Sequence, residues 1–350
     1  MIEILTASEE DKELWNAFLA DRQHALHEHR FEWREIISKT FKHTPHYIFA
    51  KQSGRVCGVF PLFFVSSALS GKALISVPYI NAGGPVGESE EIEQALLKEA
   101  ISLSEKTGAR FLEVRNRTPL NVDKANLKER THKAAVSLEI QKNSAEVFDS
   151  FSSKLRSQIR RPERDGVSAK VFRGTEISER TLNDFYKVFS ENMRDLGTPS
   201  YPKALFKEVL KEFGNDLSVI LAYKNSAAIA GGATIRNGSR TEILWASSLR
   251  RFNALSPNMI MYWHAIKHAC ESGCNEFDFG RSTPGTGPHK FKLQWGAQEK
   301  TLHWYYHMIE GELPDINPRS AKYTLLVNTW SKLPLCVTRP LGAYLTRHLP

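Results

Sequence analysis

Short apolar runs and longer amphipathic stretches alternate along the first half of the chain. The run at 2–5 predicts a strand, and Ser8 is a suitable N-cap for a helix that extends to about residue 22. A Gln-Ser-Gly-Arg turn between two apolar runs predicts a hairpin over 47–65. The remaining elements expected here are a helix over 32–41, a strand over 73–77, an amphipathic helix over 88–107, and strands over 111–115 and 134–140.

The second half repeats this order of elements. Strands are expected over 217–224 and 227–235, joined by a turn at Asn225-Ser226. The other predicted elements are strands over 169–172, 241–246, 276–279 and 301–307, helices near 177–195 and 202–213 and over 257–271, and a short helical segment that ends at Trp295. Helical periodicity returns over 323–333, before an apolar and basic segment that prolines interrupt. The alternation indicates an α/β fold.

Two segments of the first half can be laid over segments of the second. FAKQSGRVCGVFPL (49–62) matches LAYKNSAAIAGGAT (221–234), and LSEKTGARFLEVR (103–115) matches KHACESGCNEFDFGR (267–281). In the second pair a helix ends at Gly108 or Gly273, the expected left-handed position, and a strand with one central acid follows. A duplicated α/β unit is favoured over a chance likeness. The expected domains are 1–150 and 151–315, with a C-terminal helical extension over 316–350.

Composition and charge narrow the class of protein. The 350 residues are 41% hydrophobic, which suffices for two packed cores, and they contain no apolar stretch of membrane-spanning length. The acidic N-terminus does not resemble a secretory signal, and four scattered cysteines predict no disulfide framework. We therefore expect a cytoplasmic protein, with the inner face of the cell membrane as an alternative location.

The net charge of +8 is unevenly distributed. KLRSQIRRPER (154–164) carries five cations and one glutamate, and the last 33 residues carry basic side chains without an acidic one. Such patches attract nucleic acid, nucleotide-linked substrates or an anionic membrane face, although each could equally be a solvated helix surface. The C-terminal segment is expected either to brace the second domain or to lie on an anionic membrane.

The stretch FDFGRSTPGTGPHKFKLQWG (277–296) contains the main candidate chemistry. It is not a phosphate-binding P-loop, because Gly285 is followed by Thr-Gly-Pro rather than by lysine and a hydroxyl residue. It also fails the G-x-S-x-G nucleophile pattern at its last position, so Ser282 is not an expected nucleophile. A strand end and a glycine-rich loop remain, beside Arg281, Lys290 and Lys292, and this arrangement favours anion binding.

Other polar clusters leave two interpretations open. Within MRDLGTPSYP (193–202), the side chains of Arg194, Asp195 and Tyr201 either face a binding cleft or belong to a simple loop between helices. The glycines of YINAGGP (79–85) permit either close backbone approach or a tight turn. The histidines lack the spacing of known metal motifs, and no metal site is expected.

Three stretches carry a resemblance to a known family: GVFPLFFVSSALSGKALISVPYINAGGPVG, RDLGTPSYP and FDFGRSTPGTGPHKFKLQWG. They resemble FemAB-type proteins of the GNAT superfamily, and the chain is most similar to the subgroup associated with exosortase (PEP-CTERM) and exopolysaccharide loci. The terminal WSKLPLCVTRPLGAYLTRHLP is similar to that subgroup's tail. The resemblance extends over nearly the whole chain. It implies two tandem GNAT-like domains with mixed central sheets.

The resemblance also implies an activity and a site. Fem proteins move an amino acid from aminoacyl-tRNA to an amine of a peptidoglycan precursor, and an aromatic-lysine pair lies at their acyl-transfer centre. Phe291 and Lys292 match that pair, whereas His289 stands where the family has an aromatic residue. A lysine there can stabilise the oxyanion that forms when an amine attacks an ester or thioester. The substrate-binding residues expected are Arg194, Asp195, Tyr201, Arg250, Arg251, Arg281, His289, Lys290 and Trp295.

The segment after the strand expected at 241–246 helps to distinguish between the possible acyl donors. Acetyl-CoA enzymes of the superfamily have a glycine-rich turn there, but this chain has SSLRRFNALSPNM, without glycine. A donor held by Arg250 and Arg251, such as aminoacyl-tRNA, suits the sequence better, and no cofactor is required. We therefore expect an N-acyltransferase or aminoacyltransferase acting on an amine of a cell-envelope or exopolysaccharide precursor, of glycan or peptidoglycan type. The alternatives are an acyl-CoA-dependent GNAT acetyltransferase and a non-catalytic, membrane-associated component of the polysaccharide machinery.

Overall fold

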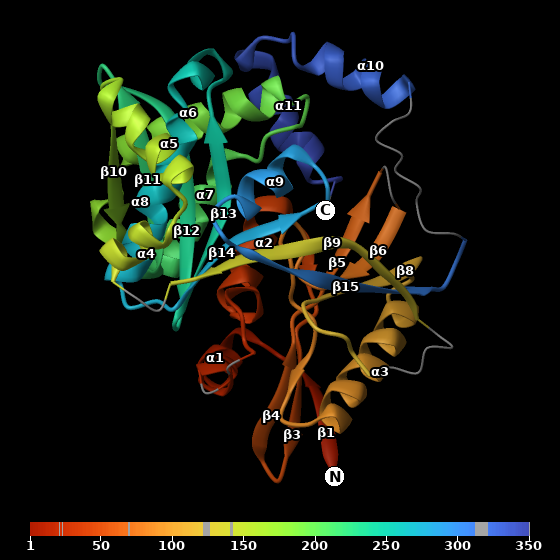
Figure 1. Ribbon diagram of the computed structural model, residues 1–350. Helices are drawn as coiled ribbons and strands as arrows, with labels where there is room; N and C mark the ends of the chain where they lie inside the picture. The colour runs from red at the N-terminus through yellow and green to blue at the C-terminus, as the bar shows by residue number, and fades with distance from the viewer. Residues whose placement is uncertain are drawn as a thin grey trace. The chain divides into compact units, whose positions relative to one another are not determined.

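The computed structural model describes residues 1–20, 22, 24–68, 71–121, 127–140, 143–311 and 321–349, and it shows an α/β fold with mixed sheets (Figure 1). The described residues form two compact units. The first unit draws on Met1–Ala134, Lys300–Asp315 and Arg347–Pro350, and the second on Ala135–Glu299 and Ile316–Thr346. No helix in the described part of the chain is long and apolar enough to cross a membrane.

The first unit contains two groups of strands. One has the order β1-β3-β4-β7, and the other contains β15, β8, β6, β5 and β2 as successive neighbours. The helices are α1 (Lys12–Ala20), α2 (Glu32–Phe41) and α3 (Glu90–Lys106). The strands are β1 (Ile2–Thr6), β2 (Thr44–Pro45), β3 (Ile48–Gln52), β4 (Arg55–Phe60), β5 (Phe63–Ser67), β6 (Gly71–Ile75), β7 (Val86–Gly87), β8 (Phe111–Asn116), β9 (Lys128–Glu139, which continues into the second unit) and most of β15 (Gln298–Met308).

The second unit is built on the strand order β10-β11-β12-β13-β14. Its strands are β10 (Val167–Arg173), β11 (Leu217–Lys224), β12 (Ala227–Asn237), β13 (Arg240–Ser248) and β14 (Glu276–Ser282). Its helices are α4 (Ser144–Ser150), α5 (Ser153–Arg164), α6 (Glu179–Asp195), α7 (Lys203–Phe213), α8 (Pro257–Glu271), α9 (Gly287–Leu293), α10 (Ala321–Trp330) and α11 (Leu335–Thr346).

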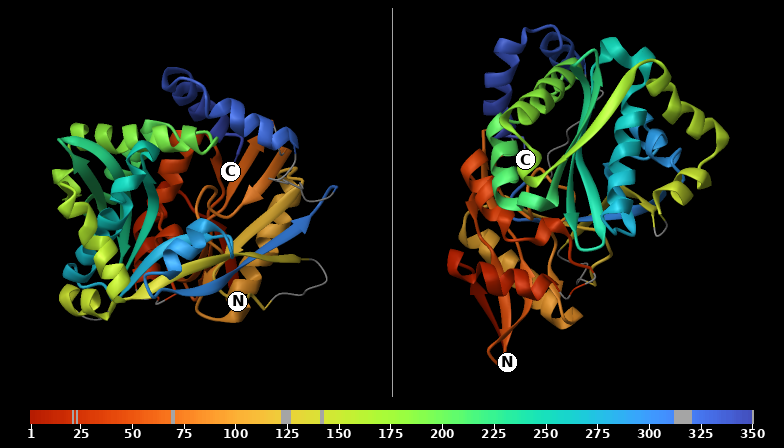
Figure 2. Two further views of the ribbon diagram at one scale, coloured as in Figure 1. Left: turned by 45° about the horizontal axis from the view of Figure 1, so that its top comes forward. Right: turned by 90° about the vertical axis from the view of Figure 1, so that its left-hand side faces the viewer.

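Helices α6 and α8 cover opposite faces of the second unit's sheet. A side chain at Gly231 of β12 would meet Phe185 of α6, whereas one at the next residue, Gly232, would meet Met261 of α8. Because successive residues of a strand point to opposite faces, the two helices lie on opposite sides (Figure 2, right). The core on the α8 side also contains Phe151, Phe277 and Trp295.

Several elements agree closely with the sequence predictions. Helices α2 and α8 have the predicted bounds, and Asn225 and Ser226 form the β11–β12 turn with positive φ angles of 47° and 65°. Gly108 and Gly273 follow α3 and α8 with φ angles of 66° and 76°, as predicted for helix ends. Two differences concern short elements: helix α4 was not predicted, and the strand expected up to residue 65 is divided at Pro61, which cannot donate to a strand ladder.

The boundaries of the two units differ from the domain boundaries drawn from the sequence. The first boundary falls at 134/135 rather than 150/151, and Lys300–Asp315 groups with the first unit rather than the second. The reason is that β15 pairs antiparallel with β8, from His303 opposite Asn116 to Met308 opposite Phe111. The C-terminal helices α10 and α11 group with the second unit instead of forming a separate extension.

Candidate active site in the second unit

The strands β13 and β14 run parallel and separate part of the way along. They pair at Arg240 with Glu276, at Thr241 with Phe277 and at Glu242 with Asp278. Within the described residues the pairing ends there, although β13 continues to Ser248 and β14 to Ser282. Beyond this point the facing edges carry backbone groups that need other partners.

Lys292 of α9 supplies one such partner. Its Nζ donates to the carbonyl oxygens of Gly280 (3.1 Å) and Arg281 (2.8 Å), on the part of β14 that lies beyond its pairs with β13. In a regular strand two successive carbonyls point to opposite edges, but Gly280 has a φ of 69° that breaks the strand geometry. The glycine therefore allows both carbonyls to reach the same ammonium group.

The electrostatic setting of Lys292 is unusual for a lysine. Its side chain is only 9% exposed, and burial lowers its pKa from 10.5 to about 8. The negative charges of Asp278 and Glu242 act in the opposite direction, and Arg281 lowers the pKa further. Both carboxyl residues are fully buried at the last β13–β14 pair. An ammonium has three N–H donors, and two described carbonyls use two of them, so one N–H can donate to a ligand.

His289 connects the glycine-rich loop to α9. Its Nδ1 accepts the backbone N–H of Gly285 (3.2 Å), and its Nε2 lies 2.5 Å from Oε2 of Glu299. The first bond makes Nδ1 an acceptor, so Nε2 carries the proton that is donated to Glu299. His289 is 6% exposed, and its two hydrogen bonds hold the loop beside Lys292. Lys290 is exposed to solvent, and Arg281 is half-buried.

Phe291 and Trp295 belong to the aromatic core beneath α9. The ring of Phe291 lies 5.1 Å from that of Tyr262, and the ring of Trp295 lies 5.6 Å from that of Phe151. Trp295 is 1% exposed, so it packs the core in this structure rather than lining an open surface. Phe291 is partly buried at the edge of the same core. The two aromatics hold α9 in place and thereby orient Lys292.

The predicted residues near the end of α6 form a second group. Nε and Nη2 of Arg194 donate to Oδ1 of Asp195, at 2.9 and 2.6 Å. Tyr201 stacks on Phe189, with ring centroids 6.1 Å apart. All three are partly exposed, and Gly197 (φ 73°) makes the turn between them. The contacts described for this group are therefore local to the end of α6 and the loop that follows it.

The arginines after β13 lie on a short 3-10 helix, Arg250–Leu255. Arg251 forms an ion pair with the buried Glu191 of α6, and its guanidinium lies 5.2 Å from the ring centroid of Phe252. Arg250 is exposed. Arg161 of α5 donates to the backbone oxygen of Ala254 (3.2 Å), which joins this helix to the basic helix α5.

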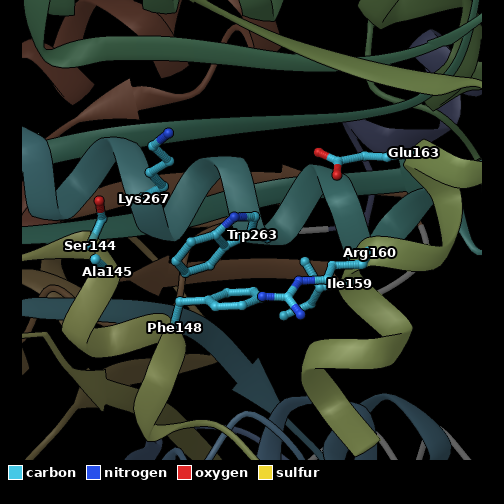
Figure 3. A pocket seen from close by; sticks show the side chains of 8 residues that line it. All are labelled: Ser144, Ala145, Phe148, Ile159, Arg160, Glu163, Trp263 and Lys267. Carbon is cyan, nitrogen blue, oxygen red and sulfur yellow. The ribbon is translucent and has the colours of Figure 1, made fainter. Parts of the chain in front are cut away.

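A groove on α4, α5 and α8 was not predicted as a site. It has a volume of about 310 Å³, and in Figure 3 the side chains of Phe148, Trp263 and Arg160 converge from these three helices. The Arg160 guanidinium lies 4.9 Å from the Phe148 ring, which lies 5.0 Å from Trp263. A second groove of about 510 Å³ is lined by Ser153, Arg156, Ser157, Arg160, Glu163 and Arg164. The positive charge of residues 154–164 indicated the second groove in the sequence. No sequence pattern indicated that Phe148 and Trp263 would lie beside this charge.

The second unit contains a sheet with helices on both faces and two parallel strands that separate beside the candidate site. Residues 153–293 match the acetyltransferase (GNAT) domain family. This matched segment includes the separated strands and Lys292. A comparison with functionally curated proteins found no match.

Solved structures with this fold extend over both units. FemX is 16% identical, with a TM-score of 0.67, covering 88% of this chain and 97% of FemX. The C-terminal domain of a putative lysylphosphatidylglycerol synthetase from Agrobacterium fabrum is 13% identical, with a TM-score of 0.58, covering 91% of this chain and 95% of that domain. A tandem GNAT protein from the clavulanic acid biosynthesis pathway is 10% identical, with a TM-score of 0.56, covering 89% and 100%. At these identities the likeness shows the fold.

Proposed function

We propose that this protein is an N-acyltransferase that transfers an acyl or aminoacyl group to an amine of a cell-envelope or exopolysaccharide precursor. The observation that carries the proposal is the position of Lys292. A nearly buried ammonium lies at the point where two parallel strands of a GNAT domain separate, and one of its N–H groups can donate to a ligand.

The chemistry follows from that donor. The acceptor amine attacks the carbonyl carbon of an ester or thioester, a C–N bond forms, and the carbonyl oxygen becomes an oxyanion. The third N–H of Lys292 donates to this oxygen, in a site where burial strengthens the interaction. Collapse breaks the C–O or C–S bond, and the proton lost by the amine balances the one gained by the leaving group. No covalent intermediate is required.

An RNA-linked donor is favoured over acyl-CoA. The segment after β13 folds as a 3-10 helix without glycine, and Ser256, which precedes α8, makes no side-chain cap there. Arg250 and Arg251 are exposed on this segment, and Arg160, Arg161 and Arg164 extend the positive charge along α5. Arginines beside Phe148 and Trp263 suit the phosphates and unstacked bases of a single-stranded acceptor end. Aminoacyl-tRNA has this chemistry.

Acyl-CoA is the second candidate donor, and two observations favour it. Residues 153–293 match a family described by acetyltransferase activity, and the unpaired edge of β13 offers backbone groups to an extended ligand. Isothermal calorimetry separates the two donors. Micromolar binding of CoA would favour the second candidate, whereas salt-sensitive binding of tRNA would favour the first.

The acceptor class rests on resemblance. The sequence is similar to FemAB-type proteins of exosortase-associated loci, and similar folds include FemX and a protein named for lysylphosphatidylglycerol synthesis. The direct test supplies radiolabelled aminoacyl-tRNA or acetyl-CoA with a nucleotide-linked amino sugar or a lysine-containing peptidoglycan precursor. Label should appear in an amide of the acceptor. Failure with every combination, in protein shown to be folded, would contradict the proposed activity.

A further inference from the structure

Helix α11 presents small and polar residues to the protein. Thr338 and Thr346 are 2% and 3% exposed, and Gly342 is buried between them in sequence. A Cβ on Gly342 would lie 2.8 Å from the backbone nitrogen of Ser200, so the helix touches the 197–201 loop directly. Arg339 donates from Nε to Oγ of Ser190 on α6 (3.0 Å). These contacts fix the orientation of α11 on the second unit.

The opposite side of α11 is apolar and exposed. Val337, Leu341 and Tyr344 follow each other at helical spacing and are 41%, 41% and 63% exposed. On α10, Leu325 and Leu326 are 67% and 61% exposed. We name these five residues the tail face; both helices are dark blue in Figures 1 and 2. A surface helix normally buries its apolar side, so α11 has the reverse arrangement and leaves its apolar side for another surface.

The charge of the segment indicates what that surface is. After Asp315 the sequence contains five lysines and arginines and no aspartate or glutamate. Lys332 and Arg347 are exposed at the two ends of α11. An apolar strip on a segment whose only charged side chains are lysines and arginines, and that includes a tyrosine, matches the boundary between acyl chains and anionic headgroups of a lipid bilayer.

We infer that the tail face docks on the surface of an anionic lipid bilayer, with α10 and α11 lying in the interface. This inference goes beyond the proposed transfer reaction, because neither Lys292 nor the donor takes part in it. The apolar side chains of the tail face would be buried among the acyl chains. The lysines and arginines of the segment would add electrostatic attraction to the anionic headgroups, which salt weakens.

Vesicle flotation of the full-length protein tests the inference. The protein should float with phosphatidylcholine vesicles that contain 30 mol% phosphatidylglycerol, and at least about tenfold less with pure phosphatidylcholine or in high salt. Leu341→Glu should lower binding to anionic vesicles roughly tenfold to a hundredfold, since it removes the burial of one leucine. Leu14→Glu is the matched control: Leu14 is 53% exposed on α1, and this variant should float like the wild type.

A fluorescent reporter on the tail gives a second measurement. Cys336 is exposed on α11, whereas Cys57 and Cys274 are buried, so in a Cys270→Ala background a polarity-sensitive thiol dye should label Cys336. Its emission should shift to the blue with anionic vesicles, and the shift should disappear in Leu341→Glu. Equal flotation of Leu341→Glu and wild type, or no flotation of the wild type, would overturn the inference. A vesicle-free dimer that Leu341→Glu dissociates would also overturn it, because a second copy would then cover the tail face.

Discussion

Lys292 combines a positive charge with almost complete burial. Two backbone carbonyls hold its ammonium, and two buried carboxyl residues lie at the strand pair beside it. Burial of a charge without compensation would be costly, so these groups explain how the lysine is tolerated. Burial still lowers the pKa of Lys292 to about 8, and groups with pKa values perturbed in this way cluster at functional sites.

The rate of transfer should depend on pH through Lys292. The oxyanion is stabilised by the protonated Lys292, whereas the acceptor amine must be deprotonated to attack, so we compare the wild type with Lys292→Met, which shares the titration of the acceptor. The ratio of the wild-type rate constant to that of Lys292→Met should be constant below the pKa of Lys292 and fall as the pH rises past about 8. Single-turnover measurements between pH 6.5 and 9.5 test this. A ratio that instead rises through pH 8 would contradict this role and would favour the neutral Lys292 amine acting as a general base.

Lys292 should also make the free energy of unfolding depend on pH, and this free energy should rise with pH where the rate advantage falls. Its folded pKa lies below the unfolded value, so between about pH 8 and 10.5 the unfolded chain binds more protons and the free energy of unfolding rises with pH. From pH 8 to 9.5 the wild type should gain about 2 kcal/mol relative to Lys292→Met, by the linkage relation. Urea unfolding of both proteins measures this difference, and a pH-independent difference would contradict a lowered pKa for Lys292 in the folded protein.

Residue-scale prediction from the sequence had a clear limit. The sequence predicts Lys292 as a site residue because it belongs to a family motif. Its carbonyl partners depend on the φ angle of Gly280, and no pattern of residue types predicts that angle. Trp295 illustrates the converse. It was expected to touch substrate because it belongs to the same motif, whereas the structure places it in the core. A motif residue can be required for packing as readily as for binding.

At the scale of elements, the two units share a helix that ends in a left-handed glycine and leads into a strand with a buried acid. In the first unit these are α3, Gly108 and Glu113; in the second they are α8, Gly273 and Asp278. The acids differ in partner, because Arg115 bonds Glu113 at 2.6 Å whereas Asp278 accepts the backbone N–H of Gly280. The correspondence was visible in the sequence because helix ends and strand patterns are local signals.

The two glycines should have similar energetic roles. No atom lies within 4 Å of a Cβ built on Gly108 or Gly273, so replacing either by alanine introduces only backbone strain. Each change should lower the free energy of unfolding by about 1 kcal/mol. Gly287→Ala is the control, since its Cβ is equally unobstructed and its φ is not left-handed. Urea denaturation gives the values, and a neutral effect at either site would argue against a strained position.

At the scale of the whole molecule, chain order and structural units do not coincide. In the first unit, residues 303–308 of β15, from far along the chain, pair with β8. Local periodicity predicted the strand itself, at 301–307, but not its neighbour, since strand pairing depends on contacts between distant segments. For the same reason no local pattern in the sequence marks the limit of the first unit at 134/135.

This arrangement makes a prediction about fragments. A fragment of residues 1–150 would leave the β8 edge unpaired, and we expect it to aggregate rather than unfold cooperatively. Joining residues 298–311 to it through a flexible linker should restore a soluble, cooperative fragment. Size-exclusion chromatography and circular dichroism on heating distinguish the outcomes. A bare 1–150 fragment that unfolds cooperatively would contradict the stabilising role of β15.

The central claim is that the Lys292 ammonium stabilises the oxyanion of acyl transfer. Its most direct test is the single-turnover rate constant, at saturating donor and acceptor, of wild type, Lys292→Met and the exposed-site control Lys170→Met. Lys292→Met should be roughly 10²- to 10³-fold slower with unchanged folding, as for loss of one oxyanion donor, and Lys170→Met should match the wild type. Transfer by folded Lys292→Met at the wild-type rate would contradict the claim.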